Sequence, residues 1–135
     1  MSVDGIAVVD KEAGWTSHDV VAKARKQLGQ KKVGHAGTLD PDATGVLVVC
    51  LGRATRLVQY LQAGRKTYAA TMVLGRETTT QDASGEVVAE VDASHIDEHA
   101  ICVALTRFQG EITQVPPMVS ALKVDGERLH EKARR

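Results

Sequence analysis

Cysteine is scarce in this chain of 135 residues, which contains only Cys50 and Cys102. The two lie 52 positions apart and have none of the short paired spacing that zinc sites use. Cys50 stands inside an apolar run, and Cys102 stands in a helix-like stretch. We therefore expect two buried, reduced thiols and no metal site.

The chain also lacks a long apolar run. Its longest, residues 46–51, is far shorter than the roughly 20 residues that cross a bilayer as a helix. The N-terminus does not have the basic-then-apolar order of a secretory signal peptide. We expect a soluble, cytoplasmic protein.

Net charge is absent as well, because 17 Lys and Arg residues balance 17 Asp and Glu residues. The balance conceals an asymmetry: residues 1–75 carry 10 basic against 6 acidic residues, whereas residues 76–120 carry 2 against 8. The densest basic run directly precedes a glycine-rich segment and comprises Lys23, Arg25, Lys26, Lys31 and Lys32. It indicates a site for the phosphates of an anionic partner. The alternative is a solvated face of a helix.

Internal repeats, low-complexity tracts and Pro/Gly/Ser-rich linkers are missing, and 43% of the residues are hydrophobic, which is enough for one core. We expect residues 1–135 to belong to a single domain. Apolar periodicity indicates a mixed α/β pattern. The expected strands are 5–9, 46–51, 68–74 and 87–91, followed by a hairpin that joins 121–124 to 127–129 through Asp125 and Gly126. The expected helices are one that Thr16 or Ser17 caps and Gly29 ends, then 54–61, then 97–108.

The same patterns predict burial. The uninterrupted apolar run 46–51 is typical of a strand covered on both faces, whereas 68–74 alternates as a strand with one face inward. Residues 76–85 are polar and are expected to form an exposed loop. The closing run LHEKARR is helix-like and has no stop signal, which indicates that the domain continues beyond residue 135.

A polar stretch is bracketed by Gly34, Gly37 and Gly45, and glycine permits backbone conformations or close approaches that other residues forbid. Within it, Pro41 disfavours helical geometry at Asp40 and holds that residue extended. From the residues alone, a stiff turn with a polar side chain and an active-site loop are equally open. A nucleotide-binding P-loop is excluded, because the lysine followed by Ser or Thr is missing.

The segment GHAGTLDPDATGVL, residues 34–47, matches every defined position of the pattern G-H-x-G-x-L-D-P-x-A-T-G-x-L. It resembles the aspartate loop of the TruB-type pseudouridine synthases. Three further segments resemble motifs of the same family, in family order: VVDKEAGWTSHDVV, KTYAATMVLGRETTTQDASG and QVPPMVSALKVDGERLHEKAR. Together the four span nearly the whole chain.

The resemblance implies an α+β fold with a mixed, mainly antiparallel sheet and flanking helices. Residues 1–135 would form the N-terminal portion of one catalytic domain, with the rest of that domain and an RNA-binding domain beyond residue 135. The implied reaction isomerises a specific uridine, position 55 in the T-loop of tRNA, to pseudouridine. The implied enzyme binds the T-arm of tRNA, needs neither metal nor organic cofactor, and is expected to be a monomer.

By motif position, the resemblance makes Asp40 the catalytic carboxylate, which either adds to the uracil ring or attacks the anomeric carbon of the ribose. An ionised carboxylate is a competent nucleophile and also stabilises positive charge at that carbon. Tyr68 matches a catalytic tyrosine that stacks on the flipped base, and His35 matches a histidine that fills the space the base leaves. The other residues expected to support the site or bind RNA are Lys11, Gly37, Thr38, Asp82, Lys31 and Lys32. Asp42 is expected to be dispensable.

Without the resemblance, simpler assignments stand beside these. Tyr68 is then a core aromatic residue on an alternating strand, and His35 is a turn residue. Lys11 and Asp82 are then solvated charges in turns.

The chain departs from the family pattern at two positions. Glu12 stands where the family often has proline, and His130 stands where tyrosine is common. The arginine that pairs with the catalytic aspartate in this family falls beyond residue 135. We therefore expect the site within these residues to be incomplete.

Two other functions stay open at this point. One is a non-catalytic RNA-binding or RNA-folding module that uses the basic run and the base pocket. The other is the related synthase that depends on guide RNAs and shares the aspartate loop. The continuous D-A-T-G of residues 42–45 and the absence of basic tails favour the stand-alone bacterial type.

Overall fold

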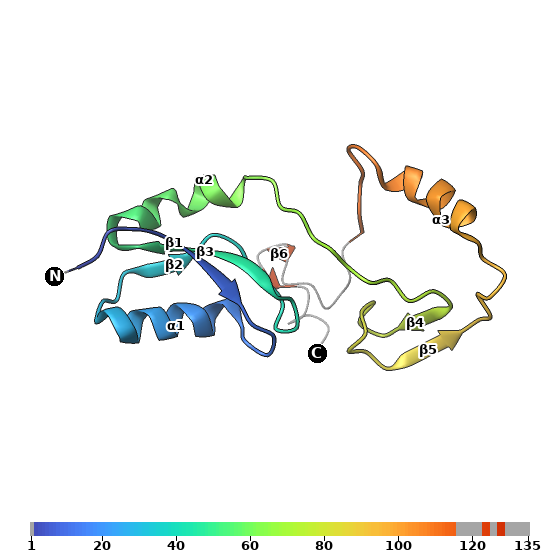
Figure 1. Cartoon of the computed structure of the whole chain (residues 1–135), viewed down its shortest axis with the longest axis horizontal. Helices are drawn as coiled ribbons and strands as arrows, with labels where there is room; N and C mark the ends of the chain where they lie inside the picture. The colour runs from blue at the N-terminus through green and yellow to red at the C-terminus, as the bar shows by residue number, and fades with distance from the viewer. Residues whose placement is uncertain (1, 116–122, 125–126, 129–135) are drawn as a thin grey trace. The chain divides into compact units, whose positions relative to one another are not determined.

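A computed structural model describes residues 2–115, 123–124 and 127–128 of the chain (Figure 1). The chain divides into two compact units, Met1–Tyr68 and Ala69–Arg135. The structure contains both helices and short sheets, and every pair of strands among the described residues is antiparallel. The expected fold class, a mainly antiparallel α+β fold with flanking helices, is confirmed.

The first unit contains a three-stranded sheet with the order β1-β3-β2, made of β1 (Gly5–Lys11), β2 (Val33–His35) and β3 (Gly45–Leu51). The central strand β3 is antiparallel to both neighbours. Lys11, the last residue of β1, pairs with Gly45, the first residue of β3. The loop 36–44 that joins β2 to β3 therefore lies at the end of the sheet where β1 ends.

One helix, α1 (Ser17–Leu28), lies along one face of this sheet (Figure 1). Thr16 caps it: the Thr16 side chain accepts a hydrogen bond from the Asp19 backbone N–H, and the Asp19 carboxylate accepts one from the Thr16 backbone N–H. An N-cap of this kind stabilises a helix by about 0.5–2 kcal/mol. Gly29 ends the helix in the left-handed conformation, with φ 59°. The predicted helix is confirmed, with Thr16 as its cap.

The core of the first unit lies between α1 and the sheet. Its buried members are Val21, Val33, Leu47, Val49 and Leu51. Leu47, Val49 and Leu51 occupy alternate positions along β3. They therefore point to the same face, because successive side chains of a strand point to opposite faces. Each such aliphatic side chain contributes roughly 1.5–3 kcal/mol when it is fully buried.

The opposite face of the sheet is covered only in part. Cys50 is completely buried there, and Val58 of α2 (Val58–Gln62) lies 4.0 Å from the position that a Cβ on Gly34 would occupy. Val8 and Val46, by contrast, are 70% and 69% exposed. The prediction that the apolar run is covered on both faces is therefore right at Cys50 and wrong at Val46, because no described residue packs over the start of β3.

The helix predicted at 54–61 begins as a 3-10 helix, η1 (Gly52–Leu57), and continues as α2. Gly52 has φ 57°, and a Cβ added there would collide with Oδ1 of Asp4. The Asp4 carboxylate accepts hydrogen bonds from the backbone N–H and the Nε of Arg53, at 2.7 and 2.6 Å. These contacts hold the start of η1 against the segment before β1.

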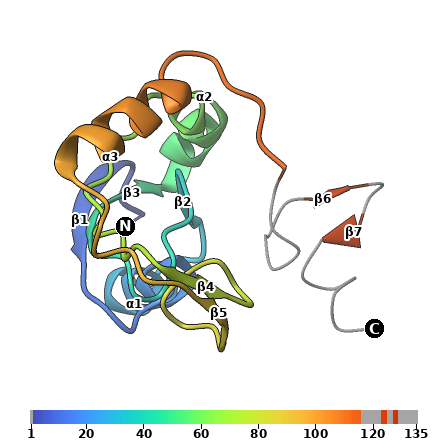
Figure 2. The same cartoon turned by 90° about the vertical axis from the view of Figure 1, so that its right-hand side faces the viewer.

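The second unit contains the antiparallel strands β4 (Arg76–Thr78) and β5 (Val87–Glu90), the helix α3 (Glu98–Leu105) and the 3-10 turn η2 (Thr106–Phe108) (Figure 2). Asp97 caps α3, because its carboxylate accepts a hydrogen bond from the Ala100 backbone N–H at 2.7 Å. The strand expected at 87–91 and the helix expected at 97–108 are confirmed. The loop expected at 76–85 begins instead with the short strand β4.

The strand expected at 68–74 is wrong. The segment belongs to no sheet of the described residues, and Tyr68 and Met72 are 62% and 63% exposed. Alternation produces a strand only where a neighbouring strand supplies hydrogen bonds and an apolar surface receives the inward side chains. No described strand pairs with this segment.

The two cysteines differ in burial. Cys50 is completely buried in β3, and this burial raises the pKa of its thiol. Cys102 lies on α3 and is exposed, so the expectation that both are buried is wrong for Cys102. The reason is that α3 has no buried residue, so its apolar side chains do not enter a core.

Two short strands follow near the end of the chain. β6 (Lys123–Val124) and β7 (Glu127–Arg128) pair in antiparallel fashion, which confirms the pairing of the predicted hairpin. Its turn residues Asp125 and Gly126, and the helix-like run 129–135 with His130, lie outside the described residues. Within the part that the structure describes, no helix is both long and apolar enough to cross a membrane.

Candidate functional site

The loop 36–44 carries the Asp40 carboxylate. The Ala43 backbone N–H donates to the Asp40 carbonyl at 3.1 Å, which closes a four-residue turn with Pro41 at its second position, where proline is favoured. Asp40 is exposed, and no described residue hydrogen-bonds its carboxylate. The carboxylate is therefore accessible, while the backbone that carries it is held in a turn.

Ser17 holds the residue before Asp40. Its hydroxyl accepts a hydrogen bond from the Leu39 backbone N–H at 2.9 Å and lies 3.4 Å from the Leu39 carbonyl, to which it donates. A serine hydroxyl has one donor and can accept, so it can serve both groups at once. Ser17 is only 1% exposed, so water does not compete for these contacts.

Lys11 holds the residue after Asp40. Its ammonium group donates to the carbonyls of Pro41, Trp15 and Glu12 at 3.0, 2.7 and 3.0 Å. The Gly14 backbone N–H also donates to the Pro41 carbonyl, at 2.9 Å. Lys11 is 1% exposed and uses all three of its donors in this way. It is a buried residue that fixes the loop, and not a solvated charge in a turn.

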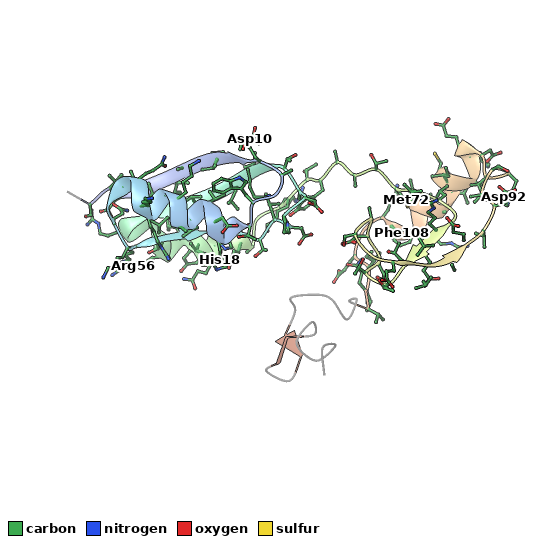
Figure 3. All side chains as sticks on the ribbon, turned by 90° about the horizontal axis from the view of Figure 1, so that it is seen from below. Asp10, His18, Arg56, Met72, Asp92 and Phe108 are labelled. Carbon is green, nitrogen blue, oxygen red and sulfur yellow. The ribbon has the colours of Figure 1, made fainter. Side chains whose placement is uncertain are left out.

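His35 ends β2 beside the same loop. Its Nδ1 lies 2.5 Å from the Gly37 carbonyl, a contact that requires the proton on Nδ1. The ring of His18 meets the His35 ring edge-on, with centroids 5.1 Å apart and planes at 79°. His18 lies in the first turn of α1, at the same end of the first unit as Asp10 of β1 (Figure 3). The two rings thus support one another next to the Asp40 loop.

A second lysine reaches the loop from another element. Gly37 has φ 153°, and a Cβ added there would lie 3.4 Å from Cε of Lys66. Lys66 follows α2, and its ammonium group donates to the Gln62 carbonyl at 2.8 Å. The structure therefore adds a cationic side chain beside the loop that sequence reasoning does not single out.

Three other expected residues of the first unit are exposed. Thr38 lies in the loop, and Lys31 and Lys32 directly precede β2. The Lys31 and Lys32 backbone carbonyls accept hydrogen bonds from Val33 and Gly52, which fixes their backbone while the side chains extend into solvent. Tyr68 is also exposed, and its hydroxyl makes no hydrogen bond within residues 2–115.

Part of the basic run is used inside the first unit. Arg25 donates from Nη2 to the Val33 carbonyl at 2.7 Å, and Lys23 lies over the Trp15 ring, 4.8 Å from its centroid. Both side chains are exposed but make contacts within the first unit, so this part of the run is not a set of free cations. Of the exposed lysines, Lys66 lies beside the loop. Lys31 and Lys32 lie at the other end of the sheet, where Val33 pairs with Leu51, the last residue of β3.

Asp82 belongs to the second unit. Its Oδ1 accepts hydrogen bonds from Ser84 Oγ at 2.5 Å, Thr80 Oγ1 at 2.7 Å and the Ser84 backbone N–H at 2.9 Å. These bonds, the Ser84 hydroxyl first, lower the pKa of Asp82 below its ordinary value. Asp82 is thus an ionised, exposed carboxylate that organises the loop between β4 and β5.

The arrangement as a whole has a definite chemistry. An exposed carboxylate stands on backbone that buried Ser17 and Lys11 hold from both sides, with a histidine pair and the Lys66 side chain beside the loop. No three His, Cys, Asp or Glu side chains of the described residues gather closely enough to hold a metal ion. Such a site is suited to nucleophilic or electrostatic catalysis by a carboxylate on an anionic substrate. The fold and site together define an α+β protein with a carboxylate-loop site.

Comparison with known proteins specifies the family. The model of the TruB family pseudouridylate synthase N-terminal domain matches residues 25–135. The tRNA pseudouridine synthases B of Symbiobacterium thermophilum and Thermobifida fusca are 58% and 56% identical over 98% and 97% of this chain. The chain belongs to the TruB family of pseudouridylate synthases. It spans 44% and 45% of the lengths of these two relatives.

A solved structure is similar as well. A chain in the crystal structure of a Cbf5-Nop10-Gar1 complex matches 88% of this chain with a TM-score of 0.58 and 34% sequence identity. The match covers 31% of that chain. The similarity at this identity extends beyond a single motif and agrees with the α+β fold.

Proposed function

We propose that this chain is the N-terminal portion of the catalytic domain of a tRNA pseudouridine synthase, with Asp40 as its catalytic carboxylate. The observation that carries the proposal is the Asp40 loop: the carboxylate is accessible, and buried Ser17 and Lys11 fix the backbone on either side of it. Membership of the TruB family and relatives named tRNA pseudouridine synthase B support the substrate class.

The reaction needs no net oxidation or reduction. The N1–C1′ bond of the uridine breaks and leaves its electron pair on N1, the uracil turns over within the site, and a C5–C1′ bond forms. C5 then loses its proton to solvent and N1 takes one up, so no atom is gained or lost overall. Asp40 participates either by adding to the uracil ring or by attacking C1′, because an ionised carboxylate can do both. Its negative charge also stabilises the positive charge that develops at C1′.

The surroundings of Asp40 suit an RNA substrate. The exposed side chain of Lys66 beside the loop is available to phosphates, and those of Lys31 and Lys32, at the other end of the sheet, are available to a more distant part of the RNA. A uridine in a folded loop must leave its stack to reach a carboxylate, and the exposed ring of Tyr68 offers a stacking surface for it. His35, braced by Gly37 and His18, is suited to fill the space that the base leaves.

We extend the proposal to the T-loop of the tRNA T-arm as the target, position 55 as the modified uridine, and a monomeric, cytoplasmic enzyme with one catalytic domain. The chemistry proposed above calls on no metal or organic cofactor. Asp82 belongs to the proposal as an ionised support for RNA or for the site.

One other function has an observation in its favour. The similar chain in the Cbf5-Nop10-Gar1 complex belongs to a protein–protein assembly, which favours a synthase that works with partners and a guide RNA. The higher identity to a protein named tRNA pseudouridine synthase B, 58% against 34%, makes this the second candidate.

An assay with a single protein separates the two candidates. A T-arm hairpin with tritium on C5 of its uridines is incubated with the natural full-length protein and nothing else. The proposal predicts release of tritium to water, and a hairpin with cytidine at the target position should release none from that position. Release only after addition of a guide RNA would favour the second candidate, and no release under either condition would contradict both.

A further inference from the structure

Ser17 has an unusual position for a buried serine. It is the first residue of α1 and is 1% exposed, yet it is not the N-cap of the helix, because Thr16 fills that role. Its hydroxyl instead bonds both backbone polar groups of Leu39, 22 positions further along the chain. Helix capping therefore does not explain why a hydroxyl is needed here.

The contact with Leu39 acts on Asp40 through the peptide plane. The Leu39 carbonyl and the Asp40 backbone nitrogen belong to one planar peptide unit, so a partner that orients the carbonyl also orients the bond from nitrogen to the Asp40 Cα. The Leu39 side chain packs on the core beneath α1. The residue before Asp40 is thus held by its side chain, its N–H and its carbonyl.

The other side of Asp40 is held independently. The Pro41 carbonyl accepts from Lys11 and from the Gly14 backbone N–H, and the Ala43 N–H closes the turn onto Asp40 itself. Removal of the Ser17 hydroxyl would leave these contacts in place. It would free only the peptide unit that precedes Asp40. The orientation of the Asp40 Cα and its carboxylate would then be less fixed.

We propose that Ser17 is a positioning residue for the Asp40 carboxylate, which it holds in register with the substrate through the Leu39–Asp40 peptide. The inference rests on the proposed function, since it assigns to Ser17 a role in that reaction. A displacement of about 1 Å in a catalytic group can lower a rate on the order of a hundredfold. Substrate binding, which we assign to the exposed lysines of the first unit, should be unaffected.

The test compares two variants of the natural full-length protein. Ser17→Ala removes the hydroxyl, and we expect kcat for pseudouridine formation to fall by about tenfold to a hundredfold with KM for tRNA nearly unchanged. Thr16→Ala is the matched control, because it weakens the same end of α1 but makes no contact with Leu39. Its kcat should stay within about twofold of the wild type at a temperature where all three proteins are folded.

A second substitution of Ser17 and a measurement of hydrogen exchange at Leu39 complete the test. Ser17→Cys keeps a small side chain with a weak donor, and its kcat should fall between those of the wild type and Ser17→Ala; it replaces Ser17→Ala if that variant does not fold. The Leu39 amide should exchange its hydrogen faster in the Ser17 variants and not in Thr16→Ala. Equal losses of kcat in the Ser17 and Thr16 variants, or an unchanged kcat, would overturn the role of Ser17. An inactive wild type would instead contradict the proposed function.

Discussion

At the scale of single residues, Lys11 shows how the site meets the cost of a buried charge. Removal of an ammonium group from water is unfavourable unless polar groups replace the water. Three carbonyls do so here, and hydrogen bonds to a charged donor are stronger than neutral ones. The same contacts join β1, the turn after it and the Asp40 loop into one rigid corner.

Replacement of this cation should weaken the fold. Lys11→Met removes the donor shared by three carbonyls, and we expect the free energy of unfolding to fall by about 1–3 kcal/mol. Urea denaturation of the variant measures the change. Lys26→Met on the exposed face of α1 is the control and should stay within about 0.5 kcal/mol of the wild type. Equal effects of the two substitutions would contradict the account of Lys11.

Gly52 is a residue whose lack of a side chain is required. Gly52→Ala would bring Cβ against Asp4 and the Val3 carbonyl and would keep a left-handed backbone, so we expect a loss of at least about 2 kcal/mol in stability. Gly29→Ala is the matched control, because Gly29 has φ 59° with no atom within 4 Å of the added Cβ. Gly29→Ala should lower the free energy of unfolding by only about 1 kcal/mol, because it strains the backbone conformation without a steric clash. Thermal or urea unfolding of both variants decides this, and equal losses would refute the steric argument.

At the scale of elements, the helix α1 links the stability of the first unit to pH. Hydrogen bonds from the Thr16 hydroxyl and then the Thr16 backbone N–H lower the pKa of Asp19 below its value in an unfolded chain. A carboxyl group with a lowered pKa in the folded state stabilises that state above its unfolded pKa. The stabilisation is lost as pH falls through the folded pKa.

Asp19→Asn tests this linkage. At neutral pH the variant should be less stable than the wild type, because the charged acceptor of the capping box is removed. The difference should shrink as pH falls below about 4, where the wild-type carboxyl itself becomes protonated. Urea titrations at several pH values measure it. A difference that stays constant from neutral to acid pH would show that the Asp19 charge does not contribute.

The elements also show where sequence signals suffice. α1 is predictable because its cap, its apolar face and its glycine stop are all local. The segment 68–74 is not, because its alternation is local but the partner strand it needs is not supplied by any described residue. The Asp40 loop is recognisable from its motif, whereas the contacts that fix it join residues 22 and 30 positions apart. Ser17, His18 and Lys66 escape sequence reasoning for that reason.

At the scale of the whole molecule, a net charge of zero conceals a local cationic site. Lys23 and Arg25 are exposed but also contact the Trp15 ring and the Val33 carbonyl within the first unit, so we assign less of the phosphate binding to them. We expect tRNA affinity to depend on Lys31 and Lys32 in particular. Most of their contribution would come from release of counterions from the RNA.

The salt dependence of binding measures that contribution. The double variant Lys31→Gln/Lys32→Gln should weaken tRNA binding and reduce the slope of log affinity against log salt by about 2, roughly 1 for each phosphate that is no longer neutralised. Arg107→Gln, which removes an exposed charge from the second unit, is the control and should leave the slope unchanged. A slope that responds equally per charge in both variants would indicate diffuse attraction rather than a phosphate-binding site at Lys31 and Lys32.

The central claim is that Asp40 performs the chemistry, and the most direct measurement is the single-turnover rate of pseudouridine formation on tRNA by the natural full-length protein and two variants. Asp40→Asn preserves size and should lower the rate by at least about a thousandfold while tRNA affinity stays within about threefold. Asp42→Asn, two positions away in the same turn, should retain a rate near that of the wild type. Turnover by Asp40→Asn comparable to the wild type, or a loss confined to Asp42→Asn, would contradict the account.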